Sequence, residues 1–429
     1  MRKVLICFFL CLLACCGAFA VSMRSGASSG LASGLGAGLG SGSSENPFDS
    51  LPMLDAYYDD SDDGTLAYWD SCTVSLLTVT PGKPIYSWFG HAAILVSTPD
   101  GRNITYDYGT FSFDDEDFFV NFAFGRLWFL CHSSYADYQL EGLEEDGRSV
   151  TRIILPFTRE QKKAIIGFLN ENVKAENRTY LYHHYKDNCA TRLRDIIDYT
   201  TDGDFRRWAE SQPGYTFRQQ ASRALSRNPF MLWLLDFLQS GQIDQPATLW
   251  DEMFLPGNLE KAVMEYYHLD NELVVDNDGN YPEVPDKPRN NILFSILFGL
   301  VLGGISAVFL ITGKEKGYFI YSGIIDVILG ILGSFLFFLI FFSNHDVTWF
   351  NENILFVNPL LFVLAVLAFR KSRKVELFSR IILAVIFLLC ILKLILPSVF
   401  IQANWTAIIV MVLIHLPGCL LGLFSRNRQ

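Results

Sequence analysis

The sequence predicts an α+β domain that is exported, followed by an all-α bundle of five membrane-spanning helices. Three observations predict this architecture: a basic and then apolar amino terminus, strand-like runs mixed with amphipathic helices up to about residue 270, and five apolar segments after residue 291. The net charge of −11 excludes the strongly basic surface that nucleic-acid binding requires. The residues predict no metal site and no cofactor.

Residues 1–20 have the pattern of a secretory signal peptide, with Arg2-Lys3 before an apolar stretch. Two cleavage patterns fit. Residues 18–20 (AFA) suit ordinary signal peptidase, which we favour, and residues 12–15 (LLAC) resemble a lipoprotein signal. Residues 21–70 are rich in glycine and serine and then acidic, which predicts a linker.

The exported domain is predicted for residues 71–270. Within it, residues 85–97 and 103–108 are strand-like and are joined by the turn sequence TPDGR, which predicts an antiparallel hairpin. His91 lies on the first strand and Asp107 on the second. Other predicted elements are strands at residues 72–80 and 149–155 and a helix at residues 158–176.

A further helix is predicted to begin at Cys189. Asp187-Asn188 suits a helix cap, and Cys189 shares an apolar helix face with Leu193 and Ile197. The positive end of the helix dipole favours a thiolate, which is the nucleophilic form of cysteine. Buried cysteines usually only pack, so this stretch alone leaves packing and catalysis equally open.

His91, Asp107 and Cys189 together supply a base, a group that orients it and a nucleophile. A lone histidine beside an apolar strand is more often structural, so the prediction depends on all three lying in one domain. Cys72 and Cys131 are the other cysteines of this domain. A disulfide between them would spare Cys189, but we favour two buried free thiols.

Residues 271–291 are acidic and rich in proline, which predicts a linker before a transmembrane domain at residues 292–424. Its five apolar segments are residues 292–312, 319–342, 354–369, 381–400 and 405–424, of which the third is short. Loops with an excess of Lys and Arg alternate with loops that lack it. The positive-inside rule therefore places residues 343–353 outside with the exported domain, and the tail at residues 425–429 in the cytoplasm.

Residues 229–238 are apolar but too short to span a membrane, so either a helix at the membrane surface or a core helix fits. Three ionisable residues lie inside predicted spans, where such side chains usually face the bundle interior. Lys393 is near the outer end, where its amine can extend to the surface, and Asp326 and His415 could pair.

Several stretches resemble, in order and spacing, the Lnb-type lipoprotein N-acyltransferases of Gram-negative bacteria. They are YSWFGHAAI at residues 86–94, YGTF at 108–111, DNCATR at 187–192, MFLP at 253–256 and, in the membrane region, NENILFVNPL at 351–360. The resemblance implies a circularly permuted papain-like fold, akin to NlpC-type hydrolases and lecithin:retinol acyltransferases, in which the cysteine follows the histidine.

The resemblance also implies site residues. Cys189 would be the nucleophile and His91 its base, while Asp107 aligns where the family often carries Asn or Asp to orient the base. His183 departs from the acidic residue expected at its position.

Apart from the resemblance, the Asn188 side chain could support the oxyanion, and Asp187 and Tyr108 are expected to support the site. Arg192, one helical turn after Cys189, could contact phosphate or form a surface ion pair. Polar residues at the predicted outer membrane boundary could bind lipid head groups or merely cap a helix; they are His345, Asn351, Asn353 and Asn358.

The implied activity is the transfer of a fatty acyl chain from a phospholipid, through a Cys189 thioester, to the amino terminus of a diacylglyceryl-cysteine lipoprotein. The implied location is the bacterial inner membrane, with the catalytic domain in the periplasm. A membrane-anchored cysteine peptidase or peptidoglycan amidase could use the same three residues. A binding module would need neither Cys189 nor His91.

Overall fold

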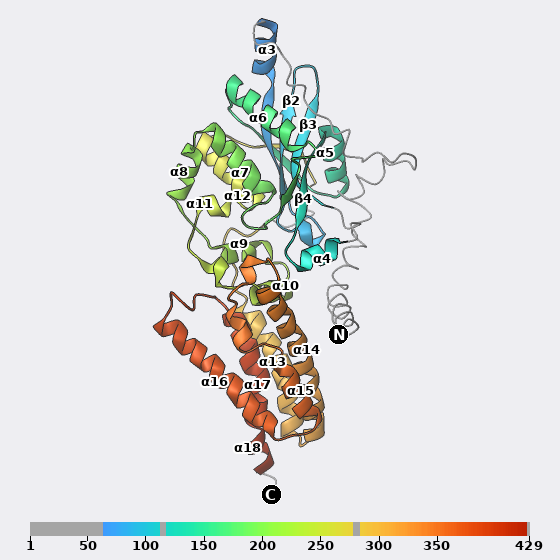
Figure 1. The fold of residues 1–429 in the computed structure, drawn as a ribbon, viewed down its shortest axis with the longest axis vertical. Coiled ribbons are helices and arrows are strands. Elements are labelled where there is room, and N and C mark those ends of the chain that lie inside the picture. The colour runs from blue at the N-terminus through green and yellow to red at the C-terminus, as the bar shows by residue number, and fades with distance from the viewer. Residues whose placement is uncertain (1–62, 112–116, 278–283, 427–429) are drawn as a thin grey trace, which may run out of the picture. The chain divides into compact units, whose positions relative to one another are not determined.

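The computed structural model describes residues 63–111, 117–277 and 284–426 (Figure 1). The predicted signal peptide and most of the first predicted linker lie outside these residues. The chain forms two compact units. Among the described residues, the first comprises 63–111, 117–119, 127–214 and 247–277, and the second comprises 120–126, 215–246 and 284–426.

The first unit is built on an antiparallel sheet with the strand order β6-β4-β3-β2-β1-β5-β9. The strands are β1 (Thr73–Val79), β2 (His91–Ser97), β3 (Asn103–Thr110), β4 (Trp128–Tyr135), β5 (Val150–Ile154), β6 (Thr179–Leu181) and β9 (Glu272–Val275). The predicted hairpin is confirmed as β2 and β3. The edge strand β9 lies in the predicted linker, where its four residues are too few to show an alternating pattern.

Helices and short elements complete this unit, and the α+β prediction is confirmed. They are α3 (Asp63–Ser71), η1 (Ile85–Ser87), α5 (Ala136–Glu145), α6 (Arg159–Asn172), α7 (Cys189–Thr200), α8 (Asp204–Glu210), β7 (Pro213–Gly214), β8 (Ala247–Thr248), α11 (Leu249–Glu252) and α12 (Pro256–Tyr267). Thr158 and Gln161 form the capping box that starts α6.

Alternate residues along the strands face two separate cores. Ile94 and Tyr106 belong to the core beneath α6, α7 and α12, whereas Ala93 belongs to the core beneath α5. Figure 1 shows α7 and α12 on one side of the strands and α5 on the other. Asp107 pairs with Ala93 across the ladder, and His91 is two residues from Ala93, so both share the α5 face.

Cys72 and Cys131 are buried and free. Cys72 immediately precedes β1, and Cys131 lies on β4, which is three strands away in the sheet. Three strand spacings amount to about 14 Å, beyond the reach of a disulfide. The favoured alternative of two buried thiols is therefore confirmed.

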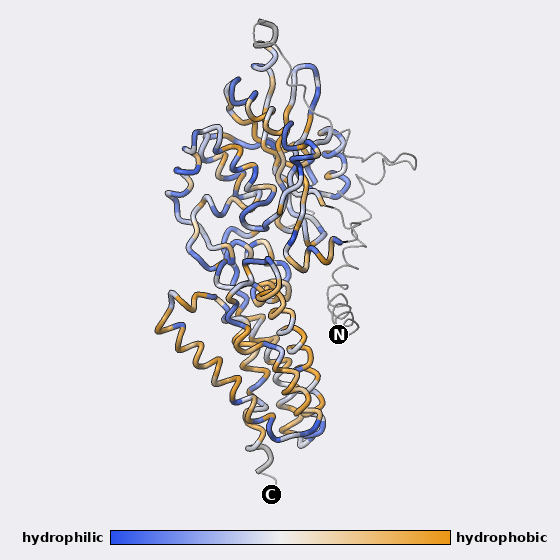
Figure 2. Tube along the Cα trace, in the orientation of Figure 1, coloured by the Kyte–Doolittle hydropathy of each residue, from blue (hydrophilic) through white to orange (hydrophobic). Residues whose placement is uncertain are grey.

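The second unit is helical, and its long helices are strongly apolar (Figure 2). Its elements are α4 (Phe118–Ala123, which the boundary between the units divides), α9 (Phe217–Ala224), α10 (Pro229–Leu238), η2 (Gly241–Asp244), α13 (Ile292–Ile311), α14 (Glu315–Phe342), η3 (Asp346–Thr348), η4 (Glu352–Leu355), α15 (Leu361–Phe369), α16 (Lys374–Ile395), α17 (Trp405–Cys419) and α18 (Leu421–Arg426).

Among the described residues, four helices are long and apolar enough to span a membrane: Ile292–Ile311, Glu315–Phe342, Lys374–Ile395 and Trp405–Leu423. The third predicted span contains only the nine residues of α15, which extend about 14 Å against a hydrocarbon thickness of about 30 Å. Pro359, which lacks a backbone N–H, lies just before this helix. The predicted count of five spanning helices is therefore not confirmed.

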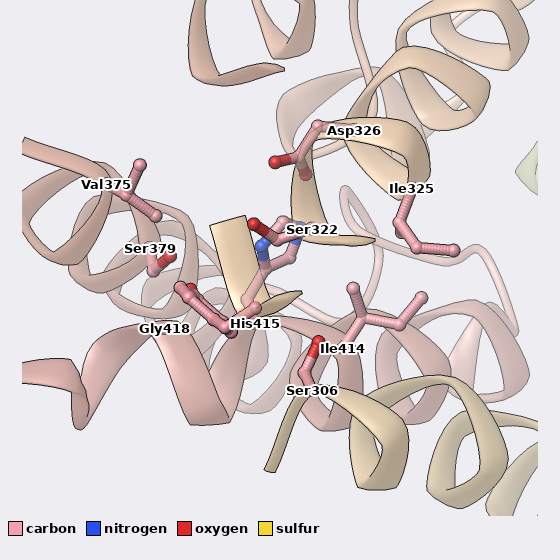
Figure 3. Close-up of a pocket in the computed structure, with 10 residues that line it drawn as sticks. Ser306, Ser322, Ile325, Asp326, Val375, Ser379, Ile414, His415 and Gly418 are labelled. Carbon is pink, nitrogen blue, oxygen red and sulfur yellow. The ribbon is translucent and has the colours of Figure 1, made fainter. Parts of the chain in front are cut away.

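The ionisable residues of the predicted spans are buried. Lys393 forms an ion pair with Glu352 and donates to Gln402 O at 2.6 Å, so the prediction that its amine extends to the surface is wrong. Asp326 and His415 line one small pocket of about 10 Å³, roughly the space of one water molecule (Figure 3). Within the described ranges no ion pair joins these two side chains, so the suggested pairing is not observed.

Candidate active site

Cys189 is the first residue of α7, as predicted. Asn188 Oδ1 accepts the Thr191 N–H at 2.9 Å, and Thr191 Oγ1 accepts the Asn188 N–H at 2.7 Å, which makes a reciprocal helix cap. Cys189 is 9% exposed and belongs to the core beneath α7. Its sulfur therefore lies at the positive end of the helix dipole in a mostly dry environment.

His91 and Asp107 form a close pair. His91 Nε2 lies 2.8 Å from Asp107 Oδ1 and 2.9 Å from Oδ2. Asp107 is 1% exposed, whereas the His91 side chain is 18% exposed. Because Nε2 is engaged by the carboxylate, Nδ1 is the ring nitrogen that remains for the sulfur of Cys189.

Gln139, on α5, completes the support of this pair and was not predicted. Its Nε2 donates to Asp107 Oδ2 at 2.7 Å. The contact holds the carboxylate in the orientation that faces His91. Gln139 lies outside every motif, and only the packing of α5 on the sheet brings it to Asp107, so no local sequence signal could have identified it.

Gly109 lies beside both the cysteine and the histidine. It has φ +105° at an irregularity of β3, a conformation that favours glycine. A Cβ at this position would lie 4.0 Å from both Cys189 Cβ and His91 Cε1. The absence of a side chain at Gly109 therefore leaves space beside both reactive groups.

The charges around His91 favour its protonated form. Burial alone would lower the pKa of His91, but the Asp107 carboxylate and the Cys189 sulfur together raise it to about 10. His132 lies opposite Asp107 on β4, and burial lowers its pKa. The proton is thus concentrated on His91, which is the arrangement of an imidazolium beside a cysteine nucleophile.

The predicted support residues contribute to structure. Asn188 Nδ2 donates to His184 O at 2.7 Å and to Phe254 O at 2.9 Å, so both amide hydrogens are already used. A role of the Asn188 side chain in stabilising an oxyanion would require one of these bonds to break. Tyr108 is 1% exposed, and burial together with the nearby Cys131 thiol raises its pKa, which identifies it as a core side chain.

Replacing Asn188 with alanine is expected to lower the free energy of unfolding by about 2 kcal/mol, because a buried cap is lost. The rate of Cys189 acylation should fall by less than about tenfold, whereas loss of an oxyanion donor would cost about 10²- to 10³-fold. Thermal unfolding and acyl-enzyme formation measure the two effects. Thr158→Ala, at the cap of α6, is the matched control and should change stability alone. A 100-fold loss of rate in stably folded Asn188→Ala would contradict this assignment.

Asp187 and Arg192 form the ion pair that was the alternative to phosphate binding. Arg192 Nε and Nη2 donate to the two Asp187 oxygens at 2.6 and 2.9 Å. The guanidinium carbon also lies 3.8 Å from the ring centroid of Tyr180. This pair braces the turn that leads into α7, and the guanidinium plane is occupied by the carboxylate and the ring.

His183 accepts the hydrogen bonds that the expected acidic residue would accept at this position. Its Nδ1 accepts the N–H groups of Tyr185 and Lys186, both at 3.1 Å. A carboxylate oxygen at this position would accept the same bonds in an Asx-type turn. The departure from the family pattern therefore leaves the turn before Cys189 intact.

The polar residues of the outer loop hold the second unit together. Asn351 and Asn353 donate to Phe237 O at the end of α10, at 3.0 and 2.8 Å. Asn358 Nδ2 donates to Ile354 O at 3.0 Å, and His345 Nε2 lies 2.8 Å from Phe122 O. Each of these residues therefore has a structural partner. The binding of lipid by them stays a prediction.

These contacts also distinguish between the two interpretations of residues 229–238. Phe237 is 1% exposed in the core of the second unit, and Trp233 Nε1 donates to Thr406 O at 3.3 Å. Phe230 remains 46% exposed. This segment is therefore a packed helix rather than one that only lies on a membrane surface.

Comparison with known proteins identified two family models. The Lnb N-terminal periplasmic domain matches residues 66–223, and the Lnb transmembrane domain matches residues 287–428. The first match contains His91, Asp107 and Cys189. No curated protein and no solved structure matched the chain.

Proposed function

The chain belongs to the Lnb family, and from this premise we propose that it is an inner-membrane N-acyltransferase that moves a fatty acyl chain from a phospholipid to the amino terminus of a diacylglyceryl-cysteine lipoprotein. The observation that carries the proposal is the close His91–Asp107 pair beside Cys189 at the start of α7. The chain order of histidine, aspartate and cysteine supports a permuted papain-like arrangement. The C-terminus is proposed to be cytoplasmic, on the positive-inside argument.

In the first step, the Cys189 thiolate attacks the carbonyl carbon of a phospholipid ester. A carbon–sulfur bond forms, and the backbone N–H of Cys189, which has no acceptor within α7, stabilises the oxyanion. When the tetrahedral intermediate collapses, the ester carbon–oxygen bond breaks. His91 gives its proton to the departing lysophospholipid oxygen, which leaves a thioester on Cys189 and a neutral imidazole.

In the second step, the amino group of the lipoprotein cysteine attacks the thioester. An amide bond forms, the carbon–sulfur bond breaks, and His91 takes the proton of the amine. The products are the N-acylated lipoprotein and the original pair of thiolate and imidazolium. Asp107 stabilises the charged imidazole throughout, and Gln139 holds Asp107.

Hydrolysis of a peptide or of a peptidoglycan amide is the competing function, with water as the second nucleophile. The transmembrane domain favours acyl transfer, because both substrates of that reaction are anchored in a membrane whereas a soluble substrate needs no membrane domain. The low exposure of Cys189, 9%, supports the same choice, because a thioester at a mostly buried position is less accessible to water.

The proposal is tested in a bacterial host that lacks its own lipoprotein N-acyltransferase. N-terminal lipopeptides from cells with and without the wild-type chain are compared by mass spectrometry. We expect triacylated peptides only with the chain. If the lipopeptides remain diacylated while the purified protein cleaves cell-wall peptides, the hydrolase function replaces this one.

A further inference from the structure

Arg148 lies at the same end of the sheet as His91. Val79, at the end of β1, pairs with His91 on one side and with Val150 on the other. Val150 is thus two strand spacings, about 10 Å, from His91 across the sheet, and Arg148 is two residues before Val150. Arg148 Nε donates to Thr80 O at 2.8 Å, which directs the side chain across β1 toward His91.

Gly82 makes room for this side chain. A Cβ at Gly82 would lie 3.1 Å from Arg148 Cδ and 3.3 Å from Nε, closer than side chains normally pack. Gly82 belongs to the turn before η1, where its N–H donates to Ser87 O at 3.1 Å. The Arg148 side chain is thus held between the end of β1 and the segment that leads to His91.

The guanidinium of Arg148 is buried and only partly hydrogen-bonded among the described residues. The residue is 4% exposed, and in the part of the chain that the structure describes, Nη2 has no hydrogen-bond partner. Asp146 interacts with it electrostatically, but no ion pair joins them in that part. Burial lowers the pKa of Arg148 to about 10, although Asp146, Cys189 and Asp107 oppose this effect. A buried cation without an anion is costly.

We propose that Arg148 binds the phosphodiester of the phospholipid acyl donor and so selects a charged lipid for Cys189. This inference rests on the proposed function. An arginine presents several N–H donors in the planar fork that matches phosphate oxygens. In a phospholipid the phosphate lies a few bonds from the ester carbonyl, so a phosphate at Arg148 leaves the ester free to extend to Cys189.

Arg192 does not compete for this role. The sequence suggested Arg192, not Arg148, as a phosphate contact, but Asp187 already engages two of the Arg192 nitrogens. An oxyanion at Cys189 is the second possible anion for Arg148. Because Arg148 lies across β1 from His91, the phosphate, which is farther from Cys189 than the oxyanion, is the favoured anion. The experiment below distinguishes phosphate binding from oxyanion binding.

The test compares two acyl donors, phosphatidylglycerol and an uncharged p-nitrophenyl ester of the same acyl chain. The second-order rate constant of Cys189 acylation is measured for each donor in the full-length protein, and their ratio is taken. Misfolded protein lowers both rates by the same factor, so the ratio reports on recognition of phosphate alone. Arg148→Gln should lower the ratio by about 10- to 100-fold. Arg148→Lys, which keeps the charge, should lower it less.

Arg159→Gln is the matched control. Arg159 pairs with Asp70 beside the start of β1, at the opposite end of that strand from Thr80. The ratio of the two acylation rate constants in Arg159→Gln should therefore equal that of the wild type. An unchanged ratio in both Arg148 variants would overturn the proposal. If both rates then fall by the same factor while the thermal unfolding midpoint equals that of the wild type, Arg148 is assigned to the oxyanion instead. If neither variant folds, inhibition of wild-type acylation by a soluble glycerophosphodiester supports the proposal, and no inhibition at millimolar concentration overturns it.

These outcomes are distinct from failure of the proposed function. A wild-type protein that forms no acyl-Cys189 with either donor would refute acyl transfer itself. A wild-type protein that acylates Cys189 normally, with no effect of Arg148→Gln, would refute only the role of Arg148.

Discussion

Cys189→Ala is expected to remove the acyl-enzyme and to reduce N-acylation by about 10⁵-fold or more, because Cys189 is the proposed nucleophile that forms the thioester. Intact-protein mass spectrometry after incubation with phospholipid detects the acyl adduct on the wild type, and its absence on the variant. N-terminal lipopeptides from the complemented host measure turnover in the same two proteins.

Cys72→Ala is the matched control for this experiment. Cys72 is fully buried beside the start of β1, at the opposite end of that strand from His91, so its loss changes packing without touching the site. It should keep the acyl adduct and the triacylated lipopeptides. Triacylation by Cys189→Ala at the wild-type level would show that another group is the nucleophile.

Asp107→Ala is expected to slow acylation by about 10²- to 10³-fold, less than the loss of Cys189, because Asp107 orients and stabilises His91 without reacting. It should also change the pH dependence. The leaving oxygen needs the proton of His91, so activity is lost as the pH rises through the pKa of His91, which is about 10 in the wild type. Without the Asp107 carboxylate this pKa falls, and the alkaline limb should move to lower pH.

The measurement is the acylation rate between pH 6 and pH 11 for the wild type and for Asp107→Ala. Gln139→Ala is the graded control, since it removes only the residue that holds Asp107 Oδ2 and should give a smaller loss with a smaller shift. An alkaline limb at the same pH in the wild type and in Asp107→Ala would contradict the role of Asp107.

The features that local signals specify could be predicted from the sequence. The start of α7 at Cys189 depends on its cap, and the hairpin of β2 and β3 depends on its turn residues. Both signals lie within a few residues of the elements they determine. The proposed nucleophile, base and orienting group were therefore identifiable as residue types before their geometry was known.

The partners of those residues could not be predicted in the same way. Gln139 meets Asp107, and Arg148 meets Thr80, only because the sheet brings distant segments together. For Asn351 and Asn353 the sequence carries a signal that fits two roles, because polar side chains at a membrane boundary suit lipid binding and helix packing equally well. Their hydrogen bonds to the carbonyl of Phe237 show the packing role, and lipid binding by these residues stays a prediction.

The division of the chain into two units has a consequence for where the protein can be truncated. The polypeptide passes from one unit to the other five times, because residues 120–126 and 215–246 group with the membrane helices although they lie between parts of the first unit. The two units are therefore interleaved rather than consecutive. A protein ended at residue 270 would lose the surfaces on which Phe124 and Phe237 pack. A chain that keeps the proposed catalytic residues but ends before the membrane helices is thus expected to carry two segments without their packing partners.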